Sequence, residues 1–430
     1  MLLYRASKLN FVGFVFAVTP FIWAAPAIAD DLNLPSIHSQ IEVTATYAPN
    51  GSLLVGWMDA DDPLGNLKNA QCAFSVSGDH GHSWGPPLFH RAIGFGVGVN
   101  PAVAVDSAGA LYALCLSGAS DQSSSIIEFA RSMDGGSHWS DWTRIAERTG
   151  GVVDKPWIAA SEVGKLQVVY SDCLKDAVTG KYTCHAEQLS STDSGATWSP
   201  RFDLSAKMPQ ISPSPIPFVT GDQGVSVYVD ANHQTFFSWG NYEKAIANSS
   251  AVRGPDAWFV KVPAGANLKD QEPIALGSNG IQVPVTQVQS DLSGNRVAVV
   301  VYDAHGNGKI VLYYSSDGGQ SWESPVTLAA SATLAAMAFD PVGNLQIEWT
   351  EIDWTGQTFQ IDVFRSEKRI VTGALTTPVS ISGPVLNPDL QKIYIGAYQS
   401  LVIAPDGERL GLWLQWGTSG TRVQASRWQP

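Results

Sequence analysis

The chain has 430 residues, of which 15% are charged, and a formal net charge of −13. With only 26 Lys and Arg it is a poor candidate for a protein that binds nucleic acid or anionic lipid through a basic surface. The low charged fraction, the 40 Gly and the 12 Tyr favour a turn-rich all-β protein over a helical one.

Residues 1–29 have the pattern of a secretory signal peptide. Arg5 and Lys8 precede the short apolar run "FVGFVFAVTPFIWAA", and "AIA" ends at Ala29 with small residues at the cleavage positions. An uncleaved anchor is the alternative, but the run is short for a membrane span and contains Pro20. We therefore expect a mature chain of residues 30–430 that is secreted or periplasmic, forms one domain and is a monomer without a membrane span. Loss of the two basic residues changes its net charge from −13 to −15.

A hairpin pattern recurs along the mature chain. Each copy is an apolar run, a tight turn rich in Asp, Asn or Gly, and a second apolar run that ends near an aromatic residue. The seven copies occupy residues 43–59, 101–117, 156–172, 225–241, 285–303, 334–351 and 400–416.

A second pattern, Ser-x-Asp-x-Gly-x-x-Trp, lies between these copies at residues 77–84, 132–139, 191–198 and 315–322. The last gap is about two repeat units long, which predicts a degenerate copy near residue 253 that keeps Asp256 and Trp258. In such a turn Ser and Asp accept backbone hydrogen bonds and Gly permits positive φ. The Trp is expected to bury its ring between strands.

Two hairpins per unit give four strands and about 57 residues, and such sheets bury both faces by stacking around an axis. The predicted fold is an all-β propeller of four-stranded blades, with seven blades favoured and six as the alternative. A β-sandwich array is the competing architecture, and it leaves the regular period unexplained. Because the last unit lacks a clear fourth strand, we expect residues 34–40 to supply one and close the ring.

Four Cys in an exported chain allow three disulfide connectivities. Cys173 and Cys184 bracket one short loop and are expected to pair, and Cys72 with Cys115 follows by elimination. A zinc site is the competing interpretation, but no CxxC pair or His partner supports it. We expect no metal and no cofactor.

At these four Ser-x-Asp-x-Gly-x-x-Trp copies the chain resembles the Asp-box, or BNR-repeat, propellers of the sialidase superfamily, of the exported bacterial type, across most of its mature length. The segments "DKPWIAAS" at Asp154 and "YIGAYQSL" at Tyr394 also resemble recurrent parts of exported members. The resemblance implies a carbohydrate ligand or another small polar ligand. Sialidases clamp a substrate carboxylate with three arginines, the first in an Arg-Ile-Pro stretch. None occurs here, and no Arg precedes Arg91 in the mature chain, so the clamp is not carried over.

The expected topology separates two faces. The first hairpin turn and the box turn of each unit share one face, and the loops after the second strands and between units surround a funnel on the other. Residues of the second class converge on that funnel, and partly desolvated carboxyls there are expected to raise one another's pKa. Lys155 would then keep Asp154 ionised. The candidate site residues are Asp59, Asp62, Asp154, Lys155, Asp172, Asp303, Glu351 and Tyr398.

Two classes of function remain open. One is a glycoside hydrolase that uses paired acids of the funnel, with a lyase that uses His305 and Tyr398 as a variant of the same class. The other is a noncatalytic exported module for binding or assembly. Two carboxyls within about 10 Å over an open pocket favour the first class. A funnel plugged by apolar side chains favours the second.

Overall fold

Twenty-nine strands and one short 3-10 helix (η1, Leu268–Asp270) make up the secondary structure of the described residues. The structure is a computed structural model. It describes residues 30–36, 38–61, 67, 69–180, 182–207, 219–241, 257–277, 286–303, 308–354, 359–387, 398–417 and 420–430. The signal peptide predicted for residues 1–29 lies outside these ranges.

The strands form seven four-stranded antiparallel blades arranged as a β-propeller, as the repeat period predicted. A short parallel pairing of Tyr182–Cys184 with Val219–Gly221 joins blades 3 and 4 into one sheet. Blade 1 is β2 (Ser39–Tyr47), β3 (Leu53–Ala60), β4 (Gln71–Ser77) and β5 (Leu88–His90), and blade 2 is β6 (Val97–Val105), β7 (Leu111–Gly118), β8 (Ser124–Ser132) and β9 (Thr143–Thr149). Blade 3 is β10 (Gly151–Ala160), β11 (Leu166–Lys175), β12 (Tyr182–Ser191) and β13 (Phe202–Asp203), and blade 4 is β14 (Val219–Val229), β15 (Thr235–Asn241), β16 (Ala257–Val262) and β17 (Ile274–Ala275).

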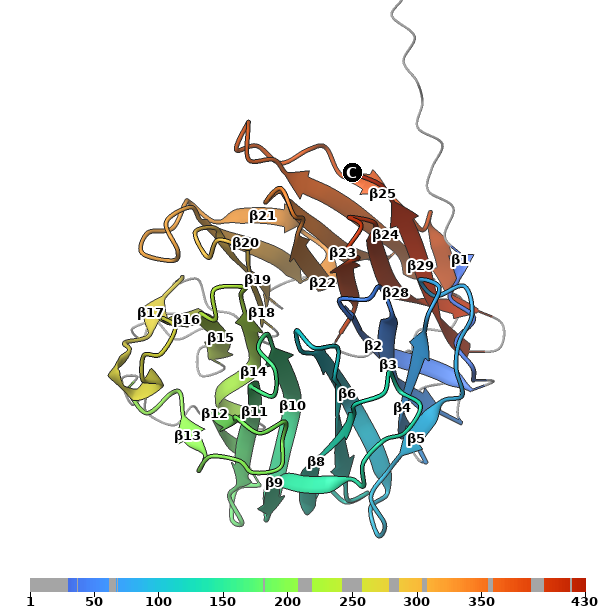
Figure 1. Ribbon diagram of the computed structural model, residues 1–430, viewed down its shortest axis with the longest axis vertical. Helices are drawn as coiled ribbons and strands as arrows, with labels where there is room; N and C mark the ends of the chain where they lie inside the picture. The colour runs from blue at the N-terminus through green and yellow to red at the C-terminus, as the bar shows by residue number, and fades with distance from the viewer. Residues whose placement is uncertain are drawn as a thin grey trace, which may run out of the picture.

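The remaining blades follow the same order. Blade 5 is β18 (Thr286–Ser290), β19 (Val297–Asp303), β20 (Lys309–Ser315) and β21 (Val326–Ala329), and blade 6 is β22 (Ala332–Phe339), β23 (Leu345–Trp354), β24 (Phe359–Lys368) and β25 (Val379–Ser380), with β26 (Val385–Asn387) also on β24. Blade 7 is β27 (Ser400–Ile403), β28 (Arg409–Gly417), β29 (Gly420–Trp428) and β1 (Asp30–Asp31). The first strands of the blades surround the centre of the ring (Figure 1). The seven predicted hairpins are the first two strands of the seven blades.

The ring is closed by the N-terminal end of the described chain. Asp30 pairs with Ala425 of the last blade, and Asp31 pairs with Gln424. We expected residues 34–40 to supply this strand, and that expectation was wrong by a few residues. The closing strand lies earlier because Leu32 and Leu34 are buried between blades 7 and 1, where they turn the chain inward to begin β2 at Ser39.

The four Ser-x-Asp-x-Gly-x-x-Trp segments, here called box turns, connect the third and fourth strands of blades 1, 2, 3 and 5. In each, the Ser hydroxyl donates to the Asp carboxylate and accepts the Gly N–H, all at 2.7–2.9 Å. The four Gly residues have φ between 80° and 90°. A box turn also contacts the first hairpin turn of its own blade, as Ser194 N–H donates to the Gly164 carbonyl at 2.9 Å.

The Trp of a box turn packs against the neighbouring blade and not between strands of its own sheet. Trp198 meets Phe129 of blade 2 edge-on at 5.2 Å, and Trp322 meets Phe259 of blade 4 at 5.0 Å. The Trp side chains are half-buried. The rings of Trp139, Trp198 and Trp322 therefore act as wedges that tie one blade to the third strand of the blade before it. Trp84 instead donates to the Leu32 carbonyl at 2.9 Å.

The degenerate fifth box turn expected near residue 253 is not where the sequence pattern placed it. Asp256 lies outside the described residues, and Trp258 lies in β16, the third strand of blade 4, where it is 7% exposed. The connection that follows the third strand of this blade is residues 263–273, which contain no Trp. The prediction failed because an aromatic residue in a strand was taken for the end of a turn.

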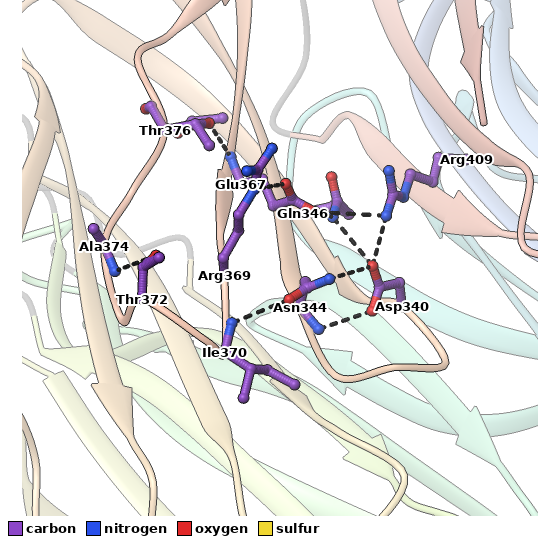
Figure 2. A network of polar contacts seen from close by, with 11 residues as sticks. Asp340, Asn344, Gln346, Glu367, Arg369, Ile370, Thr372, Ala374, Thr376 and Arg409 are labelled. Carbon is purple, nitrogen blue, oxygen red and sulfur yellow. Dashed lines mark hydrogen bonds and ion pairs between the residues drawn. The ribbon is translucent and has the colours of Figure 1, made fainter. Parts of the chain in front are cut away.

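Among the described residues the buried apolar side chains form seven clusters, one at each junction between blades. The junction of blades 6 and 7 has the smallest cluster, with Val363, Ile381 and Trp413. A polar network supplements it (Figure 2): Arg409 donates to Asp340 at 2.6 Å across the junction. The core is therefore a ring of interfaces and not one central mass.

Both expected disulfides are present. Cys173–Cys184 joins directly opposed residues of β11 and β12 within blade 3. Cys72–Cys115 joins β4 of blade 1 to β7 of blade 2 and so crosses a junction.

Candidate functional site

The first strands of blades 1 to 4 share an irregularity on the face opposite the box turns. Each contains a β-bulge, and one residue of each bulge has left-handed backbone: Glu42 (φ 55°), Asn100 (φ 51°), Lys155 (φ 51°) and Gly224 (φ 62°). This conformation costs a non-Gly residue roughly 1–2 kcal/mol, and it persists where the surrounding structure enforces it. Three non-Gly residues in equivalent positions are thus held in strained backbone around one axis.

The bulges bring polar groups of successive blades together. Asn100 N–H donates to Glu42 Oε2 at 3.1 Å, and Asn100 Nδ2 donates to Asp154 Oδ1 at 2.9 Å. The Lys155 N–H also donates to Asp154 Oδ1, at 2.9 Å. Both of these hydrogen bonds to Asp154 therefore use the same oxygen. Among the described residues none donates to Oδ2, which leaves this oxygen as an acceptor.

Tyr398 completes the group from the last blade. The Lys155 ammonium lies 5.3 Å from the centroid of the Tyr398 ring, within cation–π range, and the Trp157 ring lies 5.5 Å from it. Asn100, Asp154, Lys155, Trp157 and Tyr398 are called the central group below. Asp154, Lys155 and Trp157 are half-buried, whereas Asn100 and Tyr398 are 5% and 7% exposed.

The central group narrows the channel along the axis of the ring. A cavity of only about 20 Å³ lies between Lys155, Trp157 and Tyr398 on one side and Thr286 on the other. Beyond Trp157, toward the box-turn face, the channel widens to about 300 Å³ between uncharged side chains of all seven blades. Aromatic rings therefore constrict the centre, and a ligand on the funnel face would rest on them.

Asp59 and Glu351 occupy equivalent places in the second strands of blades 1 and 6, and each accepts a hydrogen bond from the indole two residues earlier. Trp57 Nε1 lies 3.3 Å from Asp59 Oδ2, and Trp349 Nε1 lies 2.8 Å from Glu351 Oε1. The Asp59 side chain is also bonded to Ser36 and to His38 Nδ1, the latter at 2.5 Å. Asp59 is 2% exposed and Glu351 is half-buried.

Asp172 lies between blades 2 and 3, and two arginines hold it. Arg148 donates to both carboxylate oxygens, and Arg201 Nη1 donates to Oδ2 at 2.8 Å. Asp172 is 3% exposed, so this is a nearly buried ion pair with charge-assisted hydrogen bonds. It is suited to holding two blades together.

Raised carboxyl pKa values are found elsewhere. Burial, with the nearby charge of Asp203, raises the pKa of Glu187 to about 7, and burial raises the pKa of Glu348 well above its ordinary value. The box-turn acids behave oppositely. Hydrogen bonds from the residue four positions later lower the pKa of Asp134, Asp193 and Asp317 to about 2. The box turns thus carry structural carboxylates.

Of the predicted site residues, the structure brings Asp154, Lys155 and Tyr398 into one group. It records no contact between these three and Asp59, Asp172 or Glu351 among the described residues. Asp62 and His305 lie outside the described residues, as does the side chain of Asp303. None of these placements tests a catalytic role.

Sequence reasoning missed Glu42, Trp157 and Glu187. A signal for the bulges was present, because Asn100-Pro101 and Lys155-Pro156 occupy the same place in consecutive repeats. The residue before Pro avoids the right-handed helical region, so a repeated X-Pro marks irregular backbone. No comparable signal marks Glu187, whose burial depends on the packing of two blades.

Two features are absent from the described residues. None of the helices there is long and apolar enough to cross a membrane. No group of three or more His, Cys, Asp or Glu side chains in the same part of the chain could hold a metal ion.

Comparison with known proteins shows similarity at the level of the fold. No family model matches the chain, and no curated protein sequence matches it. Among solved structures, an α-L-arabinanase of Penicillium chrysogenum, solved with arabinobiose, is 17% identical with a TM-score of 0.52, covering 94% of this chain and 98% of that one. A protein of unknown function from Dyadobacter fermentans is 11% identical with a TM-score of 0.53, over 94% and 98% of the two chains. At these identities the similarity establishes a shared propeller fold.

Proposed function

We propose that this protein is an exported propeller of the Asp-box type that binds a carbohydrate at its central funnel. The observation that carries the proposal is the set of strained bulges, which hold Asn100 and Lys155 in left-handed backbone and present Asp154 and Tyr398 beside them. Backbone strain of this kind clusters at binding and catalytic sites, because packing for stability alone does not select it.

The central group has the chemistry that a sugar requires. Asp154 Oδ2 accepts hydrogen bonds from hydroxyl groups, and Lys155 donates to them. The half-buried ring of Trp157, supported by the buried Tyr398, presents an aromatic face on which the C–H face of a pyranose or furanose ring packs. The arabinanase of similar fold is consistent with this class of ligand.

Glycoside hydrolysis is the second candidate, and it requires two carboxyl groups on either side of the scissile bond. Asp154 is the carboxylate of the central group. Its partner is sought among the other acids of the funnel loops: Asp59, Asp62, Asp303 and Glu351. We assign Asp172 a positioning role, since Arg148 and Arg201 already occupy its carboxylate oxygens.

A glycan panel, read for both binding and cleavage, tests these proposals. Asp154→Asn and Lys155→Met are expected to weaken binding of any glycan that the wild-type protein retains by about tenfold or more, the effect of losing roughly 1.4 kcal/mol. Asp141→Asn, an exposed acid after the box turn of blade 2, serves as the matched control. Cleavage that Glu351→Gln abolishes while binding persists would identify the second carboxyl.

If Asp154→Asn and Lys155→Met fold normally and bind every retained glycan as the wild-type protein does, the funnel is not the site. If no member of the panel is retained, the proposal of a carbohydrate ligand fails. Melting curves of each variant separate loss of the site from loss of the fold.

Export is the second part of the proposal. Cleavage after Ala29 would leave Asp30 and Asp31, the residues of the closing strand, as the new N-terminus. Two disulfides also suit an oxidising compartment. The mass of the protein recovered from periplasm or medium is expected to match a chain that starts at Asp30. A mature protein that retains residues 1–29 would contradict this.

A further inference from the structure

The junction of blades 3 and 4 lacks the wedge that ties other blades together. In three junctions a Phe stands three residues before the end of the third strand and meets the box-turn Trp of the next blade. The pairs are Phe74 with Trp139, Phe129 with Trp198, and Phe259 with Trp322. At the corresponding place in blade 3 the residue is Gln188, and the corresponding connection of blade 4, residues 263–273, has no Trp. Both halves of the wedge are missing at this junction. The same is true between blades 5 and 6, where Leu312 stands at the place of the Phe and residues 369–378 contain no Trp.

A groove of about 960 Å³ occupies this position, on the box-turn side of the molecule and away from the central funnel. Its floor contains Gln167, Gln188, Phe202 and Phe237, and the segment from Pro263 to Lys269 forms a wall. This volume lies at the upper end of the range of small-molecule sites, about 300–1,000 Å³. One of the lining residues, Gln188, stands at the position that the Phe occupies in the three junctions with a wedge.

The wall of the groove is ordered by its own contacts. Asn267 caps the 3-10 helix by accepting the Lys269 N–H at 3.1 Å, and Ala266 N–H donates to the Pro263 carbonyl at 3.0 Å. Lys207, from blade 3, donates to the Gln271 carbonyl at 3.0 Å and so ties the end of this segment to the opposite side. The groove is therefore held open by a connected frame, and a ligand would not need to order it.

The floor is uncharged and combines amides with aromatic rings. Gln188 Nε2 donates to Gln167 Oε1 at 2.7 Å. The other two side-chain groups of this pair, the acceptor Gln188 Oε1 and the donor Gln167 Nε2, can then bind a ligand. Phe202 is half-buried beside them. Paired amides next to an aromatic face match the hydroxyl groups and the C–H face of a sugar ring.

Most of the charged side chains at the rim are paired with one another. Glu162 lies 2.5 Å from Lys165 and 3.3 Å from the His233 ring, and Lys269 of the wall adds one further positive charge. A neutral ligand fits this surface better than an acidic peptide or a polyanion.

We infer that the groove between blades 3 and 4 is a second binding site, separate from the central funnel, for a segment of a neutral oligosaccharide. Gln167 and Gln188 bind hydroxyl groups there, and the half-buried ring of Phe202 packs against the sugar. The site is independent of the proposed funnel site because it lies on the opposite face and shares no residue with it.

Hydrogen–deuterium exchange tests the inference on the full mature chain, with millimolar arabinohexaose, xylohexaose, cellohexaose and maltohexaose as separate probes. At least one probe is expected to slow exchange in residues 263–271. The same protection is expected in Asp154→Asn, so failure of the funnel proposal leaves this result intact. Gln188→Ala and Gln167→Ala are each expected to lower the affinity for the sugar that gives protection about tenfold, equivalent to about 1.4 kcal/mol. Calorimetry measures this affinity.

Gln320→Ala, an exposed glutamine of the box turn in blade 5, is the control and is expected to bind as the wild type does. If Gln188→Ala does not fold, Gln167→Ala carries the same test, because its side chain is only half-buried. The inference is overturned if no sugar protects residues 263–271, or if protection persists at full affinity in folded glutamine variants. Protection by a neutral peptide of similar length and by no sugar would also overturn it.

Discussion

Glu187 combines burial with the absence of a hydrogen-bond partner. It is 6% exposed, and its Oε2 atom has no partner among the described residues. Burial and the charge of Asp203 raise its pKa from 4.5 to about 7, against the opposing effect of Arg201. The folded protein thus holds a proton between these pH values that the unfolded chain releases, and the free energy of unfolding falls as pH rises through this window.

Glu187→Gln, which is neutral at every pH, is expected to remove this loss. Relative to the wild type, the variant should gain about 1–3 kcal/mol of unfolding free energy between pH 5 and pH 8. Urea denaturation at both pH values measures the gain, with the exposed Glu272→Gln as control. His185 also has a raised pKa, first from its hydrogen bond to Asp203 and in smaller part from the charge of Glu187. Its own contribution to the slope therefore also becomes smaller in the variant. An equal slope in wild type and variant would show that Glu187 is ionised in the folded state.

At the scale of the element, the box turn is a hydrogen-bonded loop that carries a wedge. Trp198→Ala is expected to lower the free energy of unfolding by about 3 kcal/mol, because it removes a half-buried ring from the junction of blades 2 and 3. Phe129→Ala should do the same. A double-mutant cycle by denaturant melts is expected to show a coupling of about 1 kcal/mol between the two rings. Additive effects would mean that the rings pack independently.

Ligand binding at the funnel should survive Trp198→Ala, since the box turns and the central group lie on opposite faces of the ring. Binding that disappears while melting is unchanged would show that the box-turn face contains the site.

At the scale of the whole molecule, one disulfide constrains the junction of two blades and the other constrains two strands of a single blade. Cys72–Cys115 spans 43 residues and joins two blades, whereas Cys173–Cys184 spans 11 residues within one sheet. Loop closure in the unfolded chain predicts losses of roughly 4 and 3 kcal/mol for the respective double Cys→Ser variants. Thermal melts check this order, and peptide mass mapping without reductant checks the pairing. A smaller loss for the longer span would indicate that the unfolded chain keeps blades 1 and 2 together.

Much of this architecture could be predicted from local sequence, because each hairpin is encoded within about 17–19 residues. The seven predicted hairpins therefore coincide with strand pairs such as β2–β3 and β22–β23. Errors arose where the outcome depends on distant contacts. The local sequence around Trp258 resembles a turn, and only its pairing with Trp239 shows that it lies in a strand. The position of the closing strand depends on the burial of Leu32 and Leu34 against blade 7.

The site was less predictable for the same reason. Asp154 and Lys155 were recognised as funnel residues from topology, but Asp154 reaches its partner Asn100 across 54 residues of chain. Asp172 is fixed by arginines 24 and 29 residues away. No local pattern indicates whether a carboxylate at the end of a strand meets an arginine, an indole or open solvent.

The closure of the ring has a consequence for the timing of folding. Asp30 pairs with Ala425, so the N-terminal strand finds its partner only when nearly all of the protein has been synthesised. Pairings this distant in sequence are slow to form. Until then the edge of blade 7 has no cover and the ring can open. On the proposed export route the signal peptide enters the membrane first. A chain that cannot complete its fold during synthesis stays unfolded enough to be translocated across the membrane.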